Sequence, residues 1–583
     1  MVPELLLTAP VVVPLGVAGV YAVAAQRADA RVRIPAARVP LPAAMRRARV
    51  ASGPNSAPPA FEERGPGRSP ERGAGAAGPA RGPGAEPPGT HLYPPPGRPP
   101  RAFGKGWGGG GYAGLVAPGA ILGSALALAH RAHPAVSAYG DTLRADALTV
   151  WMLLVVGAVA ALAVAAGPAY LAGERAAGRA ADRTAHRYHL LVHAFLAAMC
   201  LAVLAGNLGV LWVAVEATTV VTAFLVGHRR TRTSVEAAWK YVVICSAGIA
   251  LAFLGTVLVY YAARQAGIPE AGALDWHVLV AHADRLDPDV TRLGIALVAL
   301  GYGAKAGLVP LHAWLPDAHS QAPAPVSALM SGVLLAVSFT AVLRYKVIAD
   351  AALGPGFVRA LLATAALLTL ALAAGLLLAQ RDYKRMLAYS SMEHMGLIAL
   401  GAAVGGPLAT AAVLLHIAGH GLAKTVAFCA SGQLLQLRRT SRIGRVRGLI
   451  AWAPGLGTAL ALAVVALLGL PPFALFASEL ALARAGFAAG MGVPVTAALA
   501  LALAAYAALA VRTARMLLGP APDGHASSGT DTGPGTGAAT PLRIGPASGA
   551  PLALGLFCCA ALGLTVRPLA QLLTAAAHIA GGQ

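Results

Sequence analysis

The sequence predicts an all-α, polytopic membrane protein with about fourteen transmembrane helices. Hydrophobic residues make up 57% of its 583 residues, charged residues only 12%, and mean hydropathy is +0.65. Apolar windows of about 20 residues, the length that a helix needs to cross hydrocarbon, recur along nearly the whole chain. Lipid offers no partner to an open strand edge, so these windows are expected to be helices. The composition excludes an ordinary soluble domain.

Positive charge is concentrated in the short connections between apolar windows. The formal net charge is +21, which in a soluble protein would suggest nucleic-acid binding. Here it follows the positive-inside pattern of multi-pass proteins of the cell (inner or plasma) membrane. We expect five basic clusters in the cytoplasm, at residues 175–187, 229–232, 381–385, 438–447 and 512–515.

The chain shows no motif for a bound cofactor. Its five cysteines lie in apolar runs without CxxC spacing and are interpreted as packing residues. No Gly-rich loop stands between a strand and a helix, so we predict that this chain binds no nucleotide. We also predict no metal and no catalytic triad.

Composition divides the chain into six expected segments. The first transmembrane helix covers 1–25, and Glu4 before the basic residues favours a retained helix over a signal peptide. The others are a basic Pro/Gly/Arg-rich loop at 26–111, helices 2 and 3 with a basic loop at 112–187, a core at 188–518, a flexible linker at 519–548 and the last helix at 549–583.

The 26–111 loop is expected to be disordered, because it has too few aliphatic residues to bury. It could lie on anionic lipid. A nucleic-acid arm is the alternative, but its aromatic residues are too sparse for a stacking platform; they are Phe61, Tyr93, Phe103 and Trp107.

If successive spans cross the membrane in alternating directions, every basic cluster lies on one face of the membrane and both termini lie outside. The expected spans are 3–25, 112–130, 146–171, 188–206, 208–228, 237–262, 289–309, 322–344, 357–379, 384–405, 407–436, 448–489, 493–518 and 549–577. Two of these spans are interrupted by helix breakers. Pro310 and Pro316 follow the seventh span, and Pro471 and Pro472 lie inside the twelfth. Broken helices at membrane depth commonly flank ion paths.

Ionisable residues inside the spans are the candidate functional groups. Each costs at least about 2.5–3.5 kcal/mol at a helix centre, so it is expected to face the bundle interior with a partner. Glu216 and Lys305 are such residues in the first half, and Lys240 opens the sixth span. In the second half, the candidates are His394 after Glu393, then His416, His420 and Lys424 at spacings of four, and Glu479 near the second break.

Several of these residues have simpler interpretations. A buried histidine is more often a satisfied structural group than a relay, and Lys240 could extend to the membrane surface. His312, Asp317 and His319 could cap the broken helix. The four-residue spacing of His416 and His420 matches a zinc pair, but no Glu stands between them and their span offers no third ligand.

Residues 303–319 read Gly-Ala-Lys-Ala-Gly-Leu-Val-Pro-Leu-His-Ala-Trp-Leu-Pro-Asp-Ala-His. This segment resembles the antiporter-like membrane subunits of complex I, membrane-bound hydrogenases and multisubunit cation/proton antiporters. The resemblance extends from about Asp146 to Arg515. It implies two inverted repeats of five helices, helices 4–8 and 9–13, with helices 7 and 12 broken.

The resemblance also implies roles for the intramembrane residues. Glu216, in Val215-Glu216-Ala217-Thr218-Thr219, would pair with Lys305 to gate proton uptake. His394 and His420 match positions of a central axis, Lys424 a lysine of some members, and Glu479 an acid at the exit. The helix-eight lysine of several quinone-oxidoreductase subunits is replaced here by Ala336, and the chain looks most like the hydrogenase-4 component F branch.

We therefore expect a proton-translocating, non-catalytic subunit of a redox-driven complex, with other membrane subunits as partners. A subunit of a multisubunit Na⁺(K⁺)/H⁺ antiporter is the first alternative. A structural anchor for a peripheral dehydrogenase is the second.

Overall fold

The computed structural model describes residues 2–32, 112–130, 135–519 and 541–582. Ten helices in this part are long and apolar enough to cross a membrane, and Ala113–Ala129 and Pro454–Leu467 are shorter apolar helices. The predicted multi-pass helical architecture is confirmed, but the count of fourteen is not. Most of the predicted 26–111 loop and 519–548 linker lies outside the described residues.

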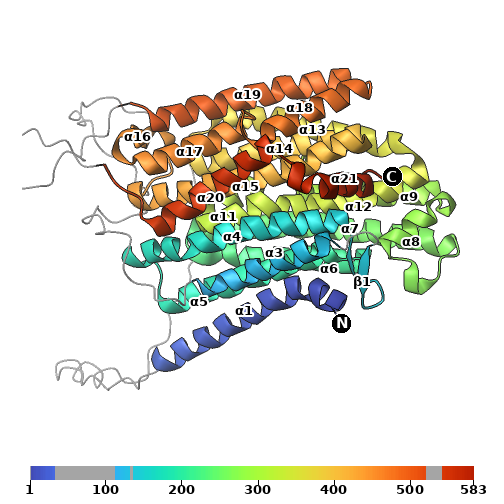
Figure 1. Ribbon diagram of the computed structural model, residues 1–583, viewed down its shortest axis with the longest axis horizontal. Helices are drawn as coiled ribbons and strands as arrows, with labels where there is room; N and C mark the ends of the chain where they lie inside the picture. The colour runs from blue at the N-terminus through green and yellow to red at the C-terminus, as the bar shows by residue number, and fades with distance from the viewer. Residues whose placement is uncertain (1, 33–111, 131–134, 520–540, 583) are drawn as a thin grey trace, which may run out of the picture. The chain divides into compact units, whose positions relative to one another are not determined.

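The N-terminal elements pack beside the rest of the bundle (Figure 1). They are α1 (Val2–Val32), η2 (Ala113–Leu115), α3 (Val116–Ala129), the antiparallel strands β1 (Val136–Ala138) and β2 (Leu143–Ala145), and α4 (Ala147–Ala176). The candidate membrane span at the start of the chain is Pro3–Arg27, close to the predicted 3–25, and the helix α1 itself continues to Val32. Its Tyr21 ring stacks on His189, with centroids 4.7 Å apart.

Two five-helix repeats follow. The first comprises α5 (Asp182–Leu204), α6 (Leu208–Val226), α7 (Arg232–Gln265), the broken helix α9 (Pro288–Lys305) and α10 (Leu315–Gln321), and α11 (Ala324–Leu329) continuing through η6 (Met330–Leu334) into α12 (Leu335–Leu353). The second comprises α13 (Pro355–Ala379), α14 (Tyr383–Val404), α15 (Gly406–Arg438), the broken helix α17 (Pro454–Leu467) and α18 (Ala474–Ala488), and α19 (Gly492–Leu517).

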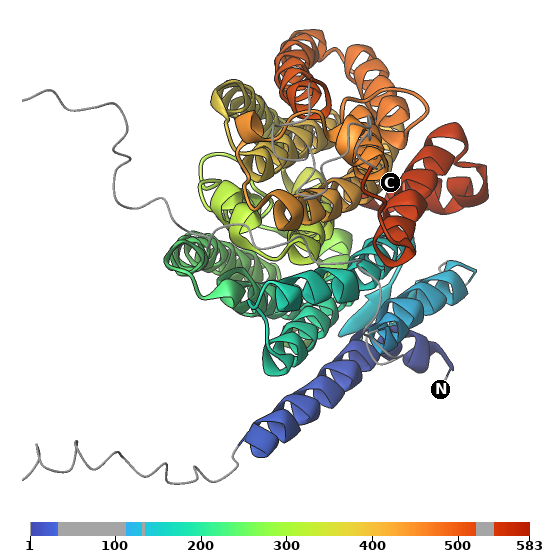
Figure 2. The same ribbon diagram turned by 90° about the vertical axis from the view of Figure 1, so that its left-hand side faces the viewer.

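The repeats share their packing but run in opposite directions. Helix α5 packs on α6 and α7 on α9, just as α13 packs on α14 and α15 on α17 and α18 (Figure 2). Helix α5 begins after the connection that holds Arg179, whereas α13 ends before the connection that holds Arg381. This is the inverted arrangement expected from the resemblance.

All five basic clusters lie at one end of the bundle, which we call the basic face. Side-chain contacts join the connections that carry them: Glu174–Arg229 (3.7 Å), Glu174–Gln436 (3.2 Å), Asp382–Ser441, and Arg512 Nε to the carbonyl of Leu377 (3.1 Å). The prediction of a single basic face is therefore confirmed. The short elements at the opposite end are η4 (Glu270–Gly272), α8 (Trp276–Ala281) and η5 (Ala283–Arg285).

Both predicted helix breaks are present. Helix α9 ends at Lys305 and α17 at Leu467, and each is followed two residues later by a glycine with positive φ, Gly307 (+82°) and Gly469 (+60°). A left-handed glycine ends a helix because it lacks the Cβ that would clash. The prolines downstream then prevent immediate continuation.

Two further interruptions were not expected. The predicted continuous span at 322–344 contains the π-helical turn η6. The predicted last span at 549–577 is divided into α20 (Pro546–Leu564), η8 (Arg567–Leu569) and α21 (Ala570–Gly581). Helix α20 ends before the extended residue Thr565, and Pro568 has no N–H to donate to the carbonyl of Leu564, so the helix cannot continue through it. Between α15 and α17 lie η7 (Ile443–Arg445) and α16 (Leu449–Trp452).

Candidate functional site

Most of the ionisable residues expected inside the membrane are enclosed by protein. Lys305, His319, His394, His416 and Lys424 are fully buried, and His420 is only 1% exposed. Glu216, Glu479 and His312 are half-buried. Lys240 differs from the others, because 46% of its side chain is exposed.

Glu216 and Lys305 are joined through Thr219. Lys305 Nζ donates to the hydroxyl of Thr219, which in turn donates to Glu216 Oε2 at 3.0 Å. In the described structure the ammonium and the carboxylate make no direct contact of 4 Å or less, and the hydroxyl of Thr219 links them. The gating ion pair implied by the resemblance stays a prediction.

The local fold explains why this bridge forms. Helix α6 carries both Glu216 and Thr219, which share one face at a spacing of three. Lys305 is the last residue of α9 and also donates to the carbonyl of Val215 at 2.9 Å. A cation at a helix C-terminus is stabilised by the helix dipole. Ser246 of α7 donates to Glu216 Oε1 at 2.9 Å and completes the carboxylate's partners.

His319 lies behind the first break, on α10. Its ring is 5.9 Å from Trp314 and 5.8 Å from Phe428, measured between centroids, and among the described residues neither ring nitrogen has a hydrogen-bond partner. A buried imidazole without partners is costly unless water satisfies its ring nitrogens. His312 instead contacts the carbonyl of Pro310 at 3.2 Å, near the surface.

Lys240 belongs to an ionic cluster at the basic face. Its Nζ lies 2.7 Å from Glu236 and 3.1 Å from Asp317, and Asp317 also accepts from Arg385. Asp317 thus ties α10 to α7 and α14. These contacts favour the surface interpretation of Lys240 that the sequence left open.

Lys424 is the buried cation of the second repeat. Its Nζ donates to the carbonyl of Leu387 at 2.8 Å and to the hydroxyl of Ser390. As with Lys305, its charge meets a hydroxyl and a carbonyl from a neighbouring helix. The carboxylate of Glu393, one turn along α14 from Ser390, has no hydrogen bond to any described residue and lies 3.4 Å from His394 Nδ1.

Three groups in the second repeat form a directional chain. Ser478 Oγ donates to the carbonyl of Leu475 at 2.9 Å, so it must accept from His416 Nδ1 at 3.0 Å. His416 Nε2 is then free to accept from His394 Nδ1 at 3.2 Å. Within the part of the chain that the structure describes, His394 Nε2 has no hydrogen-bond partner. The network thus assigns one neutral tautomer to each ring.

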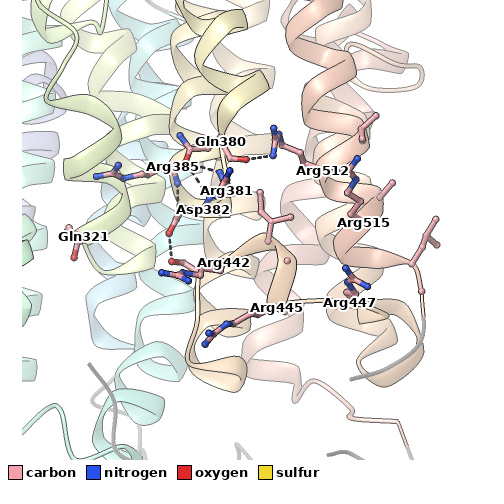
Figure 3. Close-up of a pocket in the computed structure, with 17 residues that line it drawn as sticks. Gln321, Gln380, Arg381, Asp382, Arg385, Arg442, Arg445, Arg447, Arg512 and Arg515 are labelled. Carbon is pink, nitrogen blue, oxygen red and sulfur yellow. Dashed lines mark hydrogen bonds between the residues drawn. The ribbon is translucent and has the colours of Figure 1, made fainter. Parts of the chain in front are cut away.

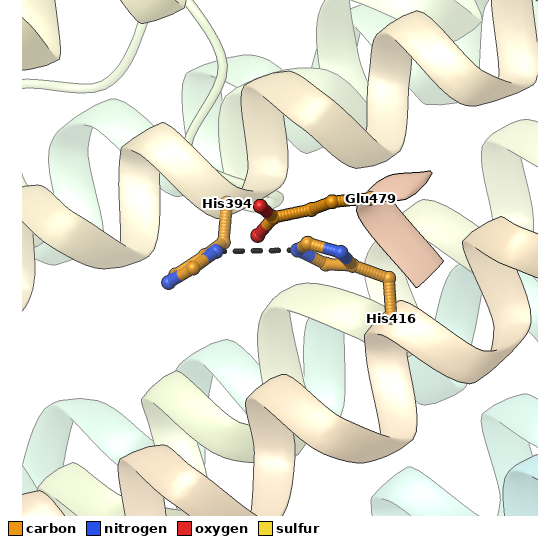
Figure 4. A group of neighbouring side chains, drawn as sticks. All are labelled: His394, His416 and Glu479. Atoms are coloured by element: carbon orange, nitrogen blue, oxygen red, sulfur yellow. Dashed lines mark hydrogen bonds between the residues drawn. The ribbon is translucent and has the colours of Figure 1, made fainter. Parts of the chain in front are cut away.

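Glu479 lies beside this pair of rings (Figure 4). Tyr506 of α19 donates to Glu479 Oε1 at 2.6 Å. The carboxylate approaches the helix break closely, since a Cβ on Gly469 would come within 2.3 Å of Glu479 Oε2. Gly469 is therefore needed both for its positive φ and for this approach.

His394, His416 and Glu479 also place one ligand atom each within 4.8 Å of one another. Two imidazoles and a carboxylate are ligand types that zinc takes. The pair considered from the sequence was His416 and His420. His420 does not belong to the group of ligands found in the structure. In the observed arrangement the facing ring nitrogens are hydrogen-bonded to each other, which a metal ion would have to displace.

Sequence reasoning missed the uncharged partners of the site. Thr219, Ser246, Ser390, Ser478 and Tyr506 are each hydrogen-bonded to a candidate residue. The usable signal was position: Thr219 lies three residues from Glu216, and Ser478 is next to Glu479. Hydroxyl side chains are common at helix interfaces in membranes and do not stand out by composition.

The fold and this enclosed row of ionisable groups define a class: polytopic membrane proteins built from inverted repeats with broken helices. The chain belongs to the family described as NADH:quinone oxidoreductase/Mrp antiporter, TM, which matches residues 205–504. The recognition made from residues 303–319 is thereby confirmed, as is the multi-pass membrane location.

Relatives agree with the branch suggested by the sequence. The chain is 38% identical over 351 residues to a hydrogenase-4 component F homolog of Methylacidiphilum infernorum, covering 60% of this chain and 73% of the relative. It is 31% identical over 359 residues to NADH-quinone oxidoreductase subunit N of Deinococcus radiodurans, covering 61% of this chain and 69% of the relative.

Solved structures share the fold. A chain of the archaeal membrane-bound sulfane sulfur reductase matches with a TM-score of 0.68 and 23% identity, covering 80% of this chain and 92% of that one. A chain of the Mrp complex from Dietzia matches with a TM-score of 0.66 and 22% identity, covering 80% of this chain and 91% of that one. A chain of respiratory complex I from Thermus thermophilus matches with a TM-score of 0.60 and 23% identity, covering 80% of this chain and 93% of that one. All three are assemblies of several subunits.

Proposed function

We propose that this chain carries protons across the cell membrane as one subunit of a redox-driven complex of the hydrogenase-4 or NADH-quinone oxidoreductase type. The observation that carries the proposal is the bridge from Lys305 through Thr219 to Glu216. It combines a buried cation, a hydroxyl and a carboxylate in an order that can pass a proton.

The bridge allows concerted transfer between two states. With Lys305 protonated and Glu216 ionised, Thr219 accepts from the ammonium and donates to the carboxylate. When Lys305 gives its proton to the hydroxyl oxygen, the hydroxyl proton passes to Glu216, and both side chains become neutral. Enclosure in a low dielectric makes this equilibrium sensitive to any nearby change of charge.

The second repeat would continue the path. Lys424, His420, His394, His416 and Glu479 supply protonatable groups on α14, α15 and α18. Within the described residues, no hydrogen bond joins Lys305 to Lys424, so passage between them requires water. Ala336 is buried in α12 and supplies no ionisable group between Lys305 and Lys424.

The driving reaction belongs to the partner subunits. This chain's own residues bind, hold and release protons, and its cysteines are dispersed and unpaired in the described structure. Electron transfer in a neighbouring subunit would change the local field and bias the Lys305–Thr219–Glu216 bridge.

The test uses vesicles that contain the assembled complex, with electron transfer and acidification measured together. Lys305→Ala and Glu216→Gln are expected to lower the number of protons moved per electron while the complex stays assembled. Lys346→Met is the matched control, because Lys346 is a buried lysine that pairs with Asp350 on its own helix. Unchanged acidification in both variants would refute the proposal and favour the anchor.

The cation/proton antiporter alternative is separated in the same vesicles. An imposed Na⁺ or K⁺ gradient without electron donor would drive proton movement in an antiporter. Under the proposal, proton movement requires the electron donor and is insensitive to the Na⁺ gradient.

A further inference from the structure

The basic face contains a large cavity with a strong excess of positive charge (Figure 3). Its volume is about 1510 Å³, and it lies between the ends of α13 and α19, the start of α14 and the connection around η7. Its lining arginines come from α14, from α19 and from the connections that follow α13 and α15, and among the described residues Asp382 is the only acidic residue in the lining.

The lining arginines are largely uncompensated. Arg385 pairs with Asp317, and Arg512 donates to carbonyls at the end of α13. Asp382 is already engaged, because it accepts from the backbone N–H of Arg385 at 3.0 Å and from the hydroxyl of Ser441. Five lining arginines form no ion pair with a described acidic residue: Arg381, Arg442, Arg445, Arg447 and Arg515.

Several guanidinium groups around one cavity repel each other unless an anion lies between them. Their planar donor forks match phosphate oxygens, to which arginine binds in a bidentate manner. The chemistry of the cavity is therefore that of a phosphate group, or of a molecule with more than one.

One wall of the cavity is apolar and continues onto the outer surface of the bundle. Val511 and Leu518 of the α19 end line the cavity and are 50% and 61% exposed, and Leu378 at the end of α13 is 59% exposed. Helices α13 and α19 pack against each other, so these residues form a common border. A soluble phosphate would leave this border uncovered, whereas acyl chains would cover it.

We propose that this cavity binds the headgroup of an anionic phospholipid, with its acyl chains along α13 and α19. Basic pockets between transmembrane helices on the cytoplasmic side are suited to such headgroups. The site lies apart from the residues assigned to proton movement, so it does not depend on the proposed function. An acidic segment of a partner protein is the competing occupant.

The test measures lipid retention by native mass spectrometry of the full chain purified in detergent. Phosphatidylglycerol, phosphatidylcholine and inorganic phosphate are the probes. The variant carries Arg442→Gln, Arg445→Gln and Arg515→Gln. The matched control carries Arg264→Gln, Arg285→Gln and Arg292→Gln, which remove the same charge at the opposite end of the bundle, at the end of α7, in η5 and at the start of α9.

Phosphatidylglycerol retained per chain is expected to fall by at least about ten-fold in the variant, since each arginine near an anionic lipid contributes measurably. The control should retain as much as the native chain, and phosphatidylcholine should bind to none. Equal retention by variant and native chain would overturn the proposal. So would displacement of the lipid by millimolar inorganic phosphate, or an assembled complex that holds an acidic protein segment there and no lipid.

A second measurement guards against a folding defect in the variant. Added phosphatidylglycerol should raise the thermal unfolding temperature of the native chain and of the control, and raise it less for single Arg445→Gln. The same rise in all three would count against the cavity as the site.

Discussion

Arg344 and Asp146 form a bidentate ion pair inside the protein, with Nη1–Oδ2 at 2.6 Å and Nη2–Oδ1 at 2.9 Å. Asp146 is also the N-cap of α4, where it accepts from the backbone N–H of Thr149 at 2.8 Å. The guanidinium lies 4.2 Å from the ring of Trp276. The pair thus fastens α12 to α4 and to α8 at the end opposite the basic face.

Removing one member of this pair should strongly destabilise the protein. Arg344→Leu leaves a buried carboxylate without its partner, at an expected cost of about 3–5 kcal/mol. Thermal unfolding in detergent measures the loss, and the double variant Asp146→Ala/Arg344→Leu should recover part of it. Arg292→Gln breaks an exposed pair with Asp289 and should cost about 0–1 kcal/mol. Equal effects of the two single variants would contradict this assignment.

Thr219→Val should uncouple the first repeat without changing its shape. Valine keeps the volume of threonine but can neither accept from Lys305 nor donate to Glu216. We expect the rate of proton movement in vesicles to fall by about 10²-fold, the loss in rate typical of removing a proton-transfer group, with assembly retained. Thr218→Val, at a buried hydroxyl that bonds only to the carbonyl of Val215, is the control. Thr219→Ser should restore activity.

The directional chain of the second repeat predicts two graded effects. His416→Phe removes the ring that accepts from His394, so proton movement in vesicles should be lost. Ser478→Ala removes the acceptor that orients His416, so we expect a smaller decrease, reversed by Ser478→Thr. His282→Phe is the control, because His282 lies outside the enclosed group of ionisable residues. It should leave the ratio of protons moved to electrons transferred unchanged. A full loss in Ser478→Ala that threonine does not reverse would show a packing defect instead.

Lys384 should be important for stability and not for proton movement. It is buried, and its Nζ donates to the carbonyls of Ser320 and Ala322 at 2.7 and 2.9 Å. It thereby connects α14 to the segment between α10 and α11. Lys384→Met should lower the free energy of unfolding by about 1–3 kcal/mol. The protons moved per electron by the complexes that do assemble should stay at the native value, and a fall in that ratio would contradict the structural role.

Some features could be predicted because they carry a large energetic cost. A charge in hydrocarbon must be enclosed, which made Lys305, Lys424 and His394 recognisable from the sequence. Breaks in the seventh and twelfth spans were expected because proline disrupts the interior of a helix. The repeats followed from the resemblance of residues 303–319, not from visible internal identity.

Other features could not be predicted because their cost is small or their partners are distant. Thr219 and Ser478 look like ordinary packing residues until the carbonyls and charges around them are known. Asp146 and Arg344 are 198 residues apart in the chain, and only the packing of the eighth span on α4, through α11 and η6, brings them together. The π-helical turn η6 contains Ser331 and Gly332 but no proline, and because serine and glycine also occur inside the regular helices α14 and α15, its sequence does not distinguish it.

That turn has a consequence for the geometry of the whole eighth span. A π-turn accommodates one more residue than a regular turn, and each residue advances a helix by about 100°. Ala336 and Ser327 therefore lie at angular positions that a helical wheel drawn across residues 324–353 would misassign. Deleting one residue within 330–334 would rotate α11 relative to α12 and turn Ser327 away from the carbonyl of His319, to which it now donates at 2.8 Å. The extra residue thus sets the rotational phase between the two halves of the span.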